Sequence, residues 1–366
     1  MGLIEKQEGG YEAFNAEVNK LVREWAIGIL KDEVKDRSKK TNVEDLDIFL
    51  RNTGFILSHI GGTSDALDMF KDAESSFGIG SKGAARTKMH MASMMRKLGQ
   101  YKEAEKAFKE ALSIQKTTLK STDVSTVNTK MNIAIVKNNL GNYGDSIKSF
   151  KEVISIQKKN FPNDRLARAR TMMNLAIALN NHCHYEQALN IYKKVVDIRS
   201  EDLKRKHAST ARAMMNMAIV LSNLGKYEDA LKTYEEVISI QDEVIGRNHT
   251  NTACSLMNKG NVLKQMGKYD EALKVLNEAK SIQESLLGRE HVDTAATIMN
   301  IGSVMLAKGK KKESLKNFNK GLGVFESALG KEHPFTTKAQ RQVRSFGTGT
   351  TFLEHEISFN TISSRE

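Results

Sequence analysis

Histidine and cysteine side chains are the first candidates for chemistry in this chain, because they can bind metal ions or act as nucleophiles. His182, Cys183 and His184 stand together, and four more histidines recur every 42 residues, at His207, His249, His291 and His333. A zinc ion needs its ligands at about 2 Å from one point. Histidines spaced at a fixed period lie on successive repeating units, and the short cluster has no fourth ligand nearby. We therefore predict no metal site and no cofactor.

Other sequence signatures of catalysis are absent. Gly78, Gly80 and Gly83 surround Lys82, but no Ser or Thr follows that lysine as a phosphate-binding loop requires. The chain also has no G-x-S-x-G, H-E-x-x-H or paired C-x-x-C pattern. We expect a protein that is not an enzyme.

Charge and composition point to a folded chain with acidic partners. The 366 residues contain 56 Lys and Arg against 44 Asp and Glu, a formal net charge of +12. This excess favours acidic partners such as nucleic acid, anionic lipid or acidic peptides, and the charge alone does not choose among them. The chain has two cysteines and no apolar run long enough to cross a membrane, and its start does not resemble a signal peptide. We expect a cytoplasmic protein that neither spans nor is anchored to a membrane.

Comparison of the chain with itself reveals an internal repeat of 42 residues. A glycine in a similar local context marks its copies, and Cys183 occupies the glycine position in one of them. The regular glycines are Gly99, Gly141, Gly225, Gly267 and Gly309. A looser copy surrounds Gly61, which brings the expected number of units to seven.

Each unit has two apolar stretches with helical spacing, one on each side of the glycine turn. A small residue lies seven positions before the glycine, and another lies five positions after it. The first set is Ala92, Ala134, Ala176, Ala218, Gly260 and Gly302, and the second is Ala104, Ser146, Ala188, Ala230, Ala272 and Ser314. A bulky residue follows the second set four positions later. Small side chains at both places allow the two helices to approach closely.

These features resemble the tetratricopeptide repeat, which has a small residue in each of two helices and a Gly-x-Tyr turn between them. The period and segments such as G-R-N-H-T-N-T-A, 246–253, are similar to the longer repeat of kinesin light chains. The resemblance implies an all-α, right-handed superhelical solenoid of antiparallel helix pairs. We expect an N-terminal helical segment at 1–43, about seven repeats at 44–334, a capping helix at 335–346 and a mobile tail at 347–366.

The resemblance also implies that the first helices line a concave groove, where methionine recurs three positions before the small residue. Flexible thioethers suit contact with varied peptides, but they also fill gaps between packed helices. Both interpretations stay open. The apolar candidates for peptide binding are Met89, Met131, Met173, Met215, Ile177 and Ile219.

Polar side chains recur on the same helices. Arginine recognises carboxylates through two parallel hydrogen bonds, and amides can pair with an extended peptide backbone. We therefore expect the chain to bind acidic or acidic-apolar peptide segments of other proteins, although these residues could also be ordinary solvated surface. The polar candidates are Arg86, Asn128, Asn138, Asn139, Arg170, Asn180, Asn181, Arg212 and Asn223.

Two alternative functions remain. One is nucleic-acid binding, for which lysines cluster between Lys308 and Lys320, although few aromatic side chains stand nearby to stack on bases. The other is a cargo adaptor related to kinesin light chains, which rests on the resemblance alone. A further ladder of asparagines, including Asn216, Asn258 and Asn300, is interpreted as internal hydrogen bonding between repeats.

Overall fold

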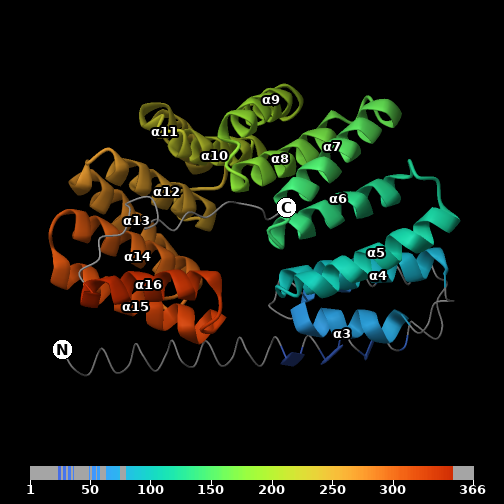
Figure 1. Ribbon diagram of the computed structural model, residues 1–366, viewed down its shortest axis with the longest axis horizontal. Coiled ribbons are helices and arrows are strands. Elements are labelled where there is room, and N and C mark those ends of the chain that lie inside the picture. The colour runs from blue at the N-terminus through green and yellow to red at the C-terminus, as the bar shows by residue number, and fades with distance from the viewer. Residues whose placement is uncertain are drawn as a thin grey trace. The chain divides into compact units, whose positions relative to one another are not determined.

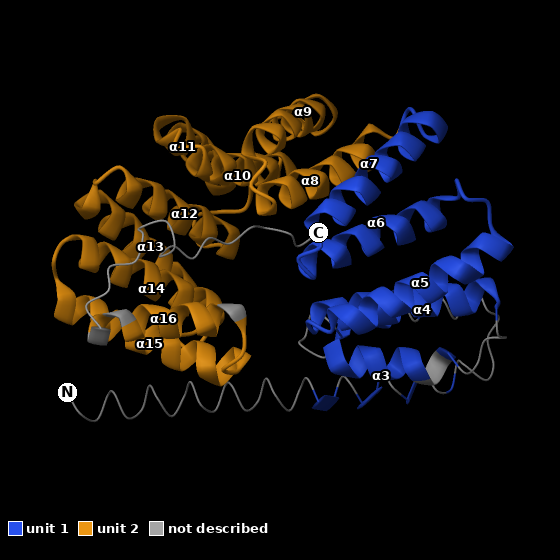
Figure 2. Cartoon of the chain, in the orientation of Figure 1, with its two compact units in different colours: residues 1–163 blue, residues 164–366 orange. Residues whose placement is uncertain are grey.

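A computed structural model describes residues 63–74 and 80–348 of the chain, together with scattered positions between 24 and 57. It divides into two compact units, residues 1–163 and residues 164–366 (Figure 2). The predicted N-terminal segment, 1–43, is described at only seven scattered positions, and residues 349–366 of the predicted tail lie outside the described residues. Within the described part of the chain, the regular secondary structure is helical and includes no β-strand.

Among its described residues, the first unit contains the five helices α3 to α7, which pack in chain order, each against the next (Figure 1). They are α3 (Thr63–Glu74), α4 (Lys82–Lys97), α5 (Tyr101–Thr118), α6 (Val124–Asn139) and α7 (Tyr143–Asn160). The helices α4 with α5, and α6 with α7, are the two halves of successive repeats.

The second unit continues the same pattern with nine described helices (Figure 1). They are α8 (Arg165–Asn181), α9 (Tyr185–Leu203), α10 (Ala208–Asn223), α11 (Tyr227–Val244), α12 (Thr250–Gln265), α13 (Tyr269–Leu287), α14 (Val292–Ala307), α15 (Lys311–Leu329) and α16 (Pro334–Thr348). Sequential neighbours pack together, and α8, α10, α12 and α14 also contact one another in that order. First helices of successive repeats therefore lie side by side.

The glycine turn ends each first helix because its backbone is left-handed. Gly99 and Gly141 have φ of 76° and 81°, and Cys183 adopts φ of 60° at the same place in its repeat. Around Gly99 the backbone N–H of Gln100 donates to the carbonyl of Met95, which lies five residues earlier. This bond is typical of a Schellman C-cap, where glycine avoids the steric cost of a β-carbon.

The two sets of small residues meet inside each helix pair, as the sequence predicts. The Ser146 hydroxyl donates to the carbonyl of Ala134 at 2.7 Å, and that of Ser314 donates to the carbonyl of Gly302 at 2.8 Å. A β-carbon on Gly302 would lie only 2.8 Å from the ring of Phe318. The prediction of close helix approach is confirmed, and with it the all-α fold of paired helices.

The last helix, α16, packs against α15 through an apolar face. The rings of Phe325 and Phe335 lie 5.9 Å apart, and those of Phe318 and Phe346 lie 5.7 Å apart. Ala339 is fully buried in the same cluster. A helix that follows Pro334 therefore covers apolar surface that α15 would otherwise expose.

Candidate functional site

The methionine row lies mostly inside the helix stack. Met173 and Met215 are only 2% and 3% exposed, Met131 is also buried, and Met89 is half-buried. The Met89 sulfur accepts hydrogen bonds from Gln115 Nε2 and Thr129 Oγ1, both at 3.1 Å. This placement favours the interpretation that the thioethers join successive helices. Ile177 and Ile219 are buried in the same way.

The polar candidates reach solvent to different degrees. Exposed side chains are those of Arg86, Asn139, Arg170 and Asn223, and partly exposed ones are those of Asn128, Asn138, Asn181 and Arg212. Asn180 is buried, with 9% of its surface exposed. Asn223 Nδ2 donates to Asn180 Oδ1 at 2.9 Å, which joins the C-terminal ends of the neighbouring helices α8 and α10. Asn180 and Asn223, both predicted to bind peptide, are thus in direct contact in the second unit.

The histidine row caps helices. His207 Nδ1 accepts the backbone N–H of Ser209 at 3.1 Å, and His249, His291 and His333 accept the equivalent N–H groups at 3.0, 3.1 and 3.2 Å. The threonine that follows three residues later, such as Thr210, donates to a carbonyl six residues before it. These imidazoles therefore satisfy helix N-termini, which otherwise have unpaired N–H groups.

A buried layer of glutamines was not among the sequence predictions. Gln115, Gln157, Gln241 and Gln283 recur at the 42-residue period within S-I-Q segments, and Arg199 takes the remaining place. All five are at most 6% exposed. Each lies near the C-terminal end of a second helix. The period of the S-I-Q segments could have revealed the layer.

These buried side chains connect one repeat to the next. Gln115 Nε2 donates to Ser125 Oγ at 2.9 Å, Arg199 Nη1 donates to the carbonyl of Ser209 at 2.7 Å, and Gln283 Oε1 accepts from Thr297 Oγ1 at 2.6 Å. Within the described residues, Oε1 has no hydrogen-bond partner in Gln115, Gln157 and Gln241, and neither has Nε2 of Gln283.

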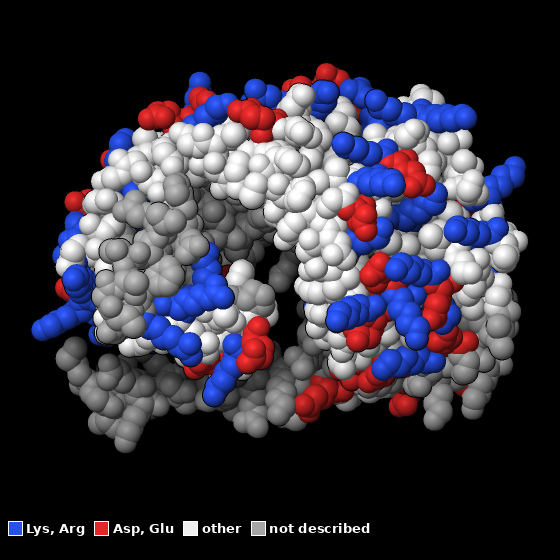
Figure 3. Space-filling model, viewed as in Figure 1, with Lys and Arg blue, Asp and Glu red and all other residues white. Residues whose placement is uncertain are grey.

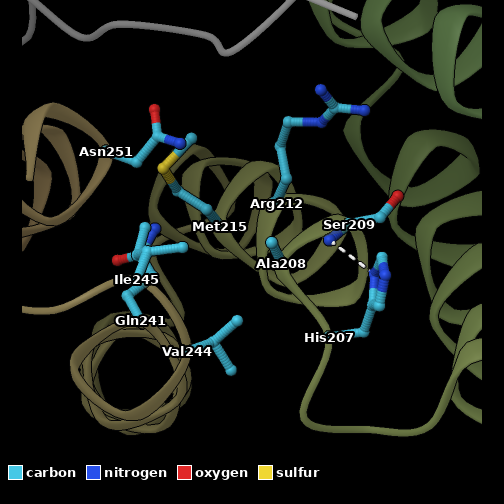
Figure 4. Close-up of a pocket in the computed structure, with 9 residues that line it drawn as sticks. All are labelled: His207, Ala208, Ser209, Arg212, Met215, Gln241, Val244, Ile245 and Asn251. Atoms are coloured by element: carbon cyan, nitrogen blue, oxygen red, sulfur yellow. Dashed lines mark hydrogen bonds between the residues drawn. The ribbon is translucent and has the colours of Figure 1, made fainter.

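A pocket of about 250 Å³ opens beside Gln241 in the second unit (Figure 4). Its walls come from the N-terminal ends of α10 and α12 and the C-terminal end of α11. Two residues predicted from the sequence to bind peptide, Arg212 and Met215, line it. The complete lining is His207, Ala208, Ser209, Arg212, Met215, Gln241, Val244, Ile245 and Asn251.

The described part of the chain has neither a metal-binding cluster nor a membrane-spanning helix. It contains no cluster of three or more His, Cys, Asp or Glu side chains arranged to hold a metal ion. Cys183 and Cys254 are free thiols, and Cys183 Sγ accepts a hydrogen bond from the Tyr185 hydroxyl at 3.4 Å. Among the described helices, none combines the length and the hydropathy needed to cross a bilayer.

Basic residues on the surface are partly neutralised. On the face shown in Figure 3, Lys and Arg are interspersed with Asp and Glu over the first unit, where Lys130 pairs with Glu152 at 2.9 Å. Lys88 pairs with both Glu74 and Glu110 at 2.7 Å. Partial burial alone would lower the pKa of Lys88, but these two carboxylates raise it overall. In contrast, residues 308–348 contain ten Lys and Arg and only three Glu.

Sequence comparison finds the same repeat in most of the chain. A family model described as a tetratricopeptide repeat matches residues 123–201, 209–284 and 251–327, and a second model with that description matches residues 84–123. No curated protein sequence matches the chain.

Solved structures share the fold at low sequence identity. The apo form of RapI is 15% identical, with 82% of this chain and 99% of RapI covered and a TM-score of 0.58. A Rap protein complexed with Competence and Sporulation Factor is 12% identical, with 88% and 98% covered and a TM-score of 0.50. BtubC (BKLC) from P. vanneervenii is 17% identical, with 69% and 94% covered and a TM-score of 0.50.

Proposed function

We propose that this chain, which belongs to the tetratricopeptide repeat family, is a non-catalytic scaffold that binds acidic or acidic-apolar peptide segments of other proteins. Stacked helix pairs present long surfaces on their first helices and can hold an extended segment across several repeats. The Rap protein of similar fold is in complex with Competence and Sporulation Factor. The two free cysteines suit the cytoplasm, where thiols stay reduced.

The observation that carries this proposal is the arrangement on α8 and α10. Arg170 is exposed on α8, Arg212 is partly exposed one repeat later on α10, and Asn223 is bonded to Asn180 between the same helices. Two guanidinium groups at a fixed period can each receive a carboxylate, while the amides can pair with peptide backbone. The net charge of +12 adds a long-range attraction for acidic segments.

Affinity capture with the full chain tests the proposal. We expect partners captured by the native chain to be lost when Arg170, Asn181, Arg212 and Asn223 are all replaced by Ala. A matched control replaces Gln187, Asn190, Lys193 and Lys232, which are exposed on α9 and α11, and removes the same charge and number of amides. Equal capture by the native chain and the first variant would disprove the proposal.

Nucleic-acid binding is a second candidate because of the basic end of the array. Lys310, Lys311, Lys312, Lys316 and Lys320 are all exposed on or beside α15. A filter-binding assay with generic RNA and DNA over a salt series separates the two candidates. Binding that falls steeply with salt favours nucleic acid, since it reports the release of counterions from phosphates. Absence of such binding leaves the peptide scaffold.

A further inference from the structure

The pocket beside Gln241 arises because its repeat differs from both neighbours. In the preceding repeat Arg199 occupies the position of Gln241 and reaches the carbonyl of Ser209 at 2.7 Å. Asp202, at the position of Val244, pairs there with Arg165 at 3.0 Å. A longer arginine and an ion pair thus stand at the two positions that Gln241 and the uncharged Val244 hold beside the pocket.

In the following repeat the glutamine oxygen has a donor within the protein, although Gln283 Nε2 has no hydrogen-bond partner among the described residues. Gln283 Oε1 accepts a hydrogen bond from Thr297, whereas Ser255, at the position of Thr297, directs its hydroxyl to the Met215 sulfur at 3.3 Å. Gln241 Oε1 is therefore left without a partner, although the residue is only 5% exposed. A buried acceptor without a donor is costly, so a ligand N–H at this point would be stabilised.

The remaining lining adds a basic end and an apolar wall. Arg212 takes the position that Cys254 holds one repeat later, and no Asp or Glu is among the residues that line the pocket. Figure 4 shows Arg212 extending from α10 on one side, Gln241 and Ile245 on the α11 side, and Met215 between them. Val244 is 43% exposed at the rim. The N-terminal ends of α10 and α12 favour negative charge, whereas the C-terminal end of α11 opposes it on the side of Gln241 and Val244.

We propose that this pocket is the subsite that receives an acidic residue and the apolar residue next to it from a bound peptide. The carboxylate pairs with Arg212, and the apolar side chain packs on Met215 and Val244. The Gln241 side chain turns toward the pocket, so that its Oε1 accepts a backbone N–H of the peptide. The proposal rests on the peptide-scaffold function. It assigns to this repeat a set of contacts that differs from both neighbours, since Arg199 replaces the glutamine in one and Thr297 already donates to the glutamine oxygen in the other.

The first test observes the pocket directly. The probe is the capped peptide acetyl-Glu-Leu-Gly-amide, added to the full chain with ¹³C-labelled methionine methyl groups. The Met215 methyl resonance is assigned by its loss in Met215→Leu. We expect this resonance to shift on titration. Acetyl-Gln-Leu-Gly-amide and acetyl-Glu-Ser-Gly-amide, which lack the carboxylate and the apolar side chain, should each bind at least tenfold more weakly.

Variants then separate the pocket from the rest of the surface. Gln241→Arg copies Arg199 of the preceding repeat, so this variant should fold. It should bind the probe at least tenfold more weakly than the native chain. Arg212→Ala should do the same, whereas Lys193→Ala, which removes an exposed positive charge from α9, should leave probe affinity unchanged. Thermal unfolding confirms that each variant is folded.

Three results would overturn the subsite. These are an unshifted Met215 resonance at saturating probe, unchanged binding in folded Gln241→Arg, or tighter binding of acetyl-Gly-Leu, whose carboxylate is a chain end. The scaffold function is judged separately by affinity capture. If the variant with Arg170, Asn181, Arg212 and Asn223 replaced loses the captured partners but Gln241→Arg keeps them, the scaffold function stands. The proposed role of this pocket is then wrong.

Discussion

Asn223 Nδ2 donates a 2.9 Å hydrogen bond to Oδ1 of Asn180, one repeat earlier on α8. Asn180 is buried and Asn223 is exposed, so the bond runs from the surface into the stack. It orients the amide of Asn180 and joins the ends of two first helices. A residue that was predicted to contact a peptide thus also holds neighbouring repeats together.

A double-mutant cycle should detect this coupling. We expect Asn180→Ala and Asn223→Ala together to cost less than the sum of the single changes, with an interaction energy of about 1 kcal/mol. Urea unfolding of the four proteins measures it. Asn139→Ala, which changes an exposed asparagine in the first unit, serves as the control. Strict additivity of the two single changes would show that the bond contributes nothing.

Cys183→Gly should stabilise the chain. Cys183 has φ of 60°, in the left-handed region, while the equivalent residue of other repeats is a glycine such as Gly141 or Gly225. A β-carbon in this region costs about 1–2 kcal/mol. We expect a higher melting temperature for Cys183→Gly but not for Cys183→Ala, which also removes the thiol yet keeps the β-carbon. Equal melting temperatures of the two variants would contradict the explanation.

Gly302→Ala should destabilise the last repeats. Its new β-carbon would lie 2.8 Å from two ring atoms of Phe318, so the ring or the helix must move. Such overpacking typically costs about 1–3 kcal/mol. Gly323 on α15 has no atom within 4 Å of an added β-carbon, and Gly323→Ala should stabilise by about 0.5–1 kcal/mol through helix propensity. Thermal unfolding compares the two. A stabilised Gly302→Ala would disprove the close approach.

Tyr234 should make the fold sensitive to alkali. Burial raises the pKa of Tyr234, and it does the same for Tyr192, where a hydrogen bond with Asn216 partly opposes the shift. The folded state therefore keeps the phenol protonated above pH 10, where the unfolded chain ionises. Stability is retained below pH 10 and lost above it, by up to about 1.4 kcal/mol per pH unit for each phenol.

Replacing Tyr234 by Phe removes one phenol that ionises above pH 10 only in the unfolded chain. The free energy of unfolding of Tyr234→Phe should therefore fall less steeply between pH 10 and 11.5 than that of the native chain. Urea titrations at several pH values measure the slope. Tyr227→Phe changes a tyrosine that is only partly buried, and it is the control. Parallel slopes for native chain and Tyr234→Phe would contradict the prediction.

The sequence predicts those features that one repeat determines by itself. Left-handed turns need glycine, and close helices need small residues, so Gly141 and Ala134 could be assigned from type and period alone. The buried placement of Asn216, Asn258 and Asn300 agrees with the predicted internal ladder. The methionine row could not be assigned, because methionine suits both a packed interior and a binding surface.

Features that depend on side-chain choices between repeats were not predictable. Ser255 and Thr297 occupy the same register, yet one bonds to Met215 and the other to Gln283. This difference leaves Oε1 unpaired in Gln241 and paired in Gln283. The division of the chain after Asn163 likewise has no counterpart in the 42-residue period.

Substitution by leucine should have opposite effects on stability at the equivalent positions Gln241 and Gln283. Gln241→Leu removes a buried oxygen that has no partner, whereas Gln283→Leu removes the acceptor of the Thr297 hydroxyl and leaves that hydroxyl buried. Leucine has a similar volume, so the apolar packing changes little at either site. We expect Gln241→Leu to be neutral or stabilising by about 1 kcal/mol and Gln283→Leu to be destabilising by about 1–3 kcal/mol, as measured by thermal unfolding.

If the pocket binds peptide, Gln241→Leu should also bind acetyl-Glu-Leu-Gly-amide more weakly than the native chain. The oxygen that destabilises the free protein is the one that the ligand uses. Equal destabilisation at both positions would mean that Gln241 Oε1 is already satisfied and would remove the physical reason for a ligand there.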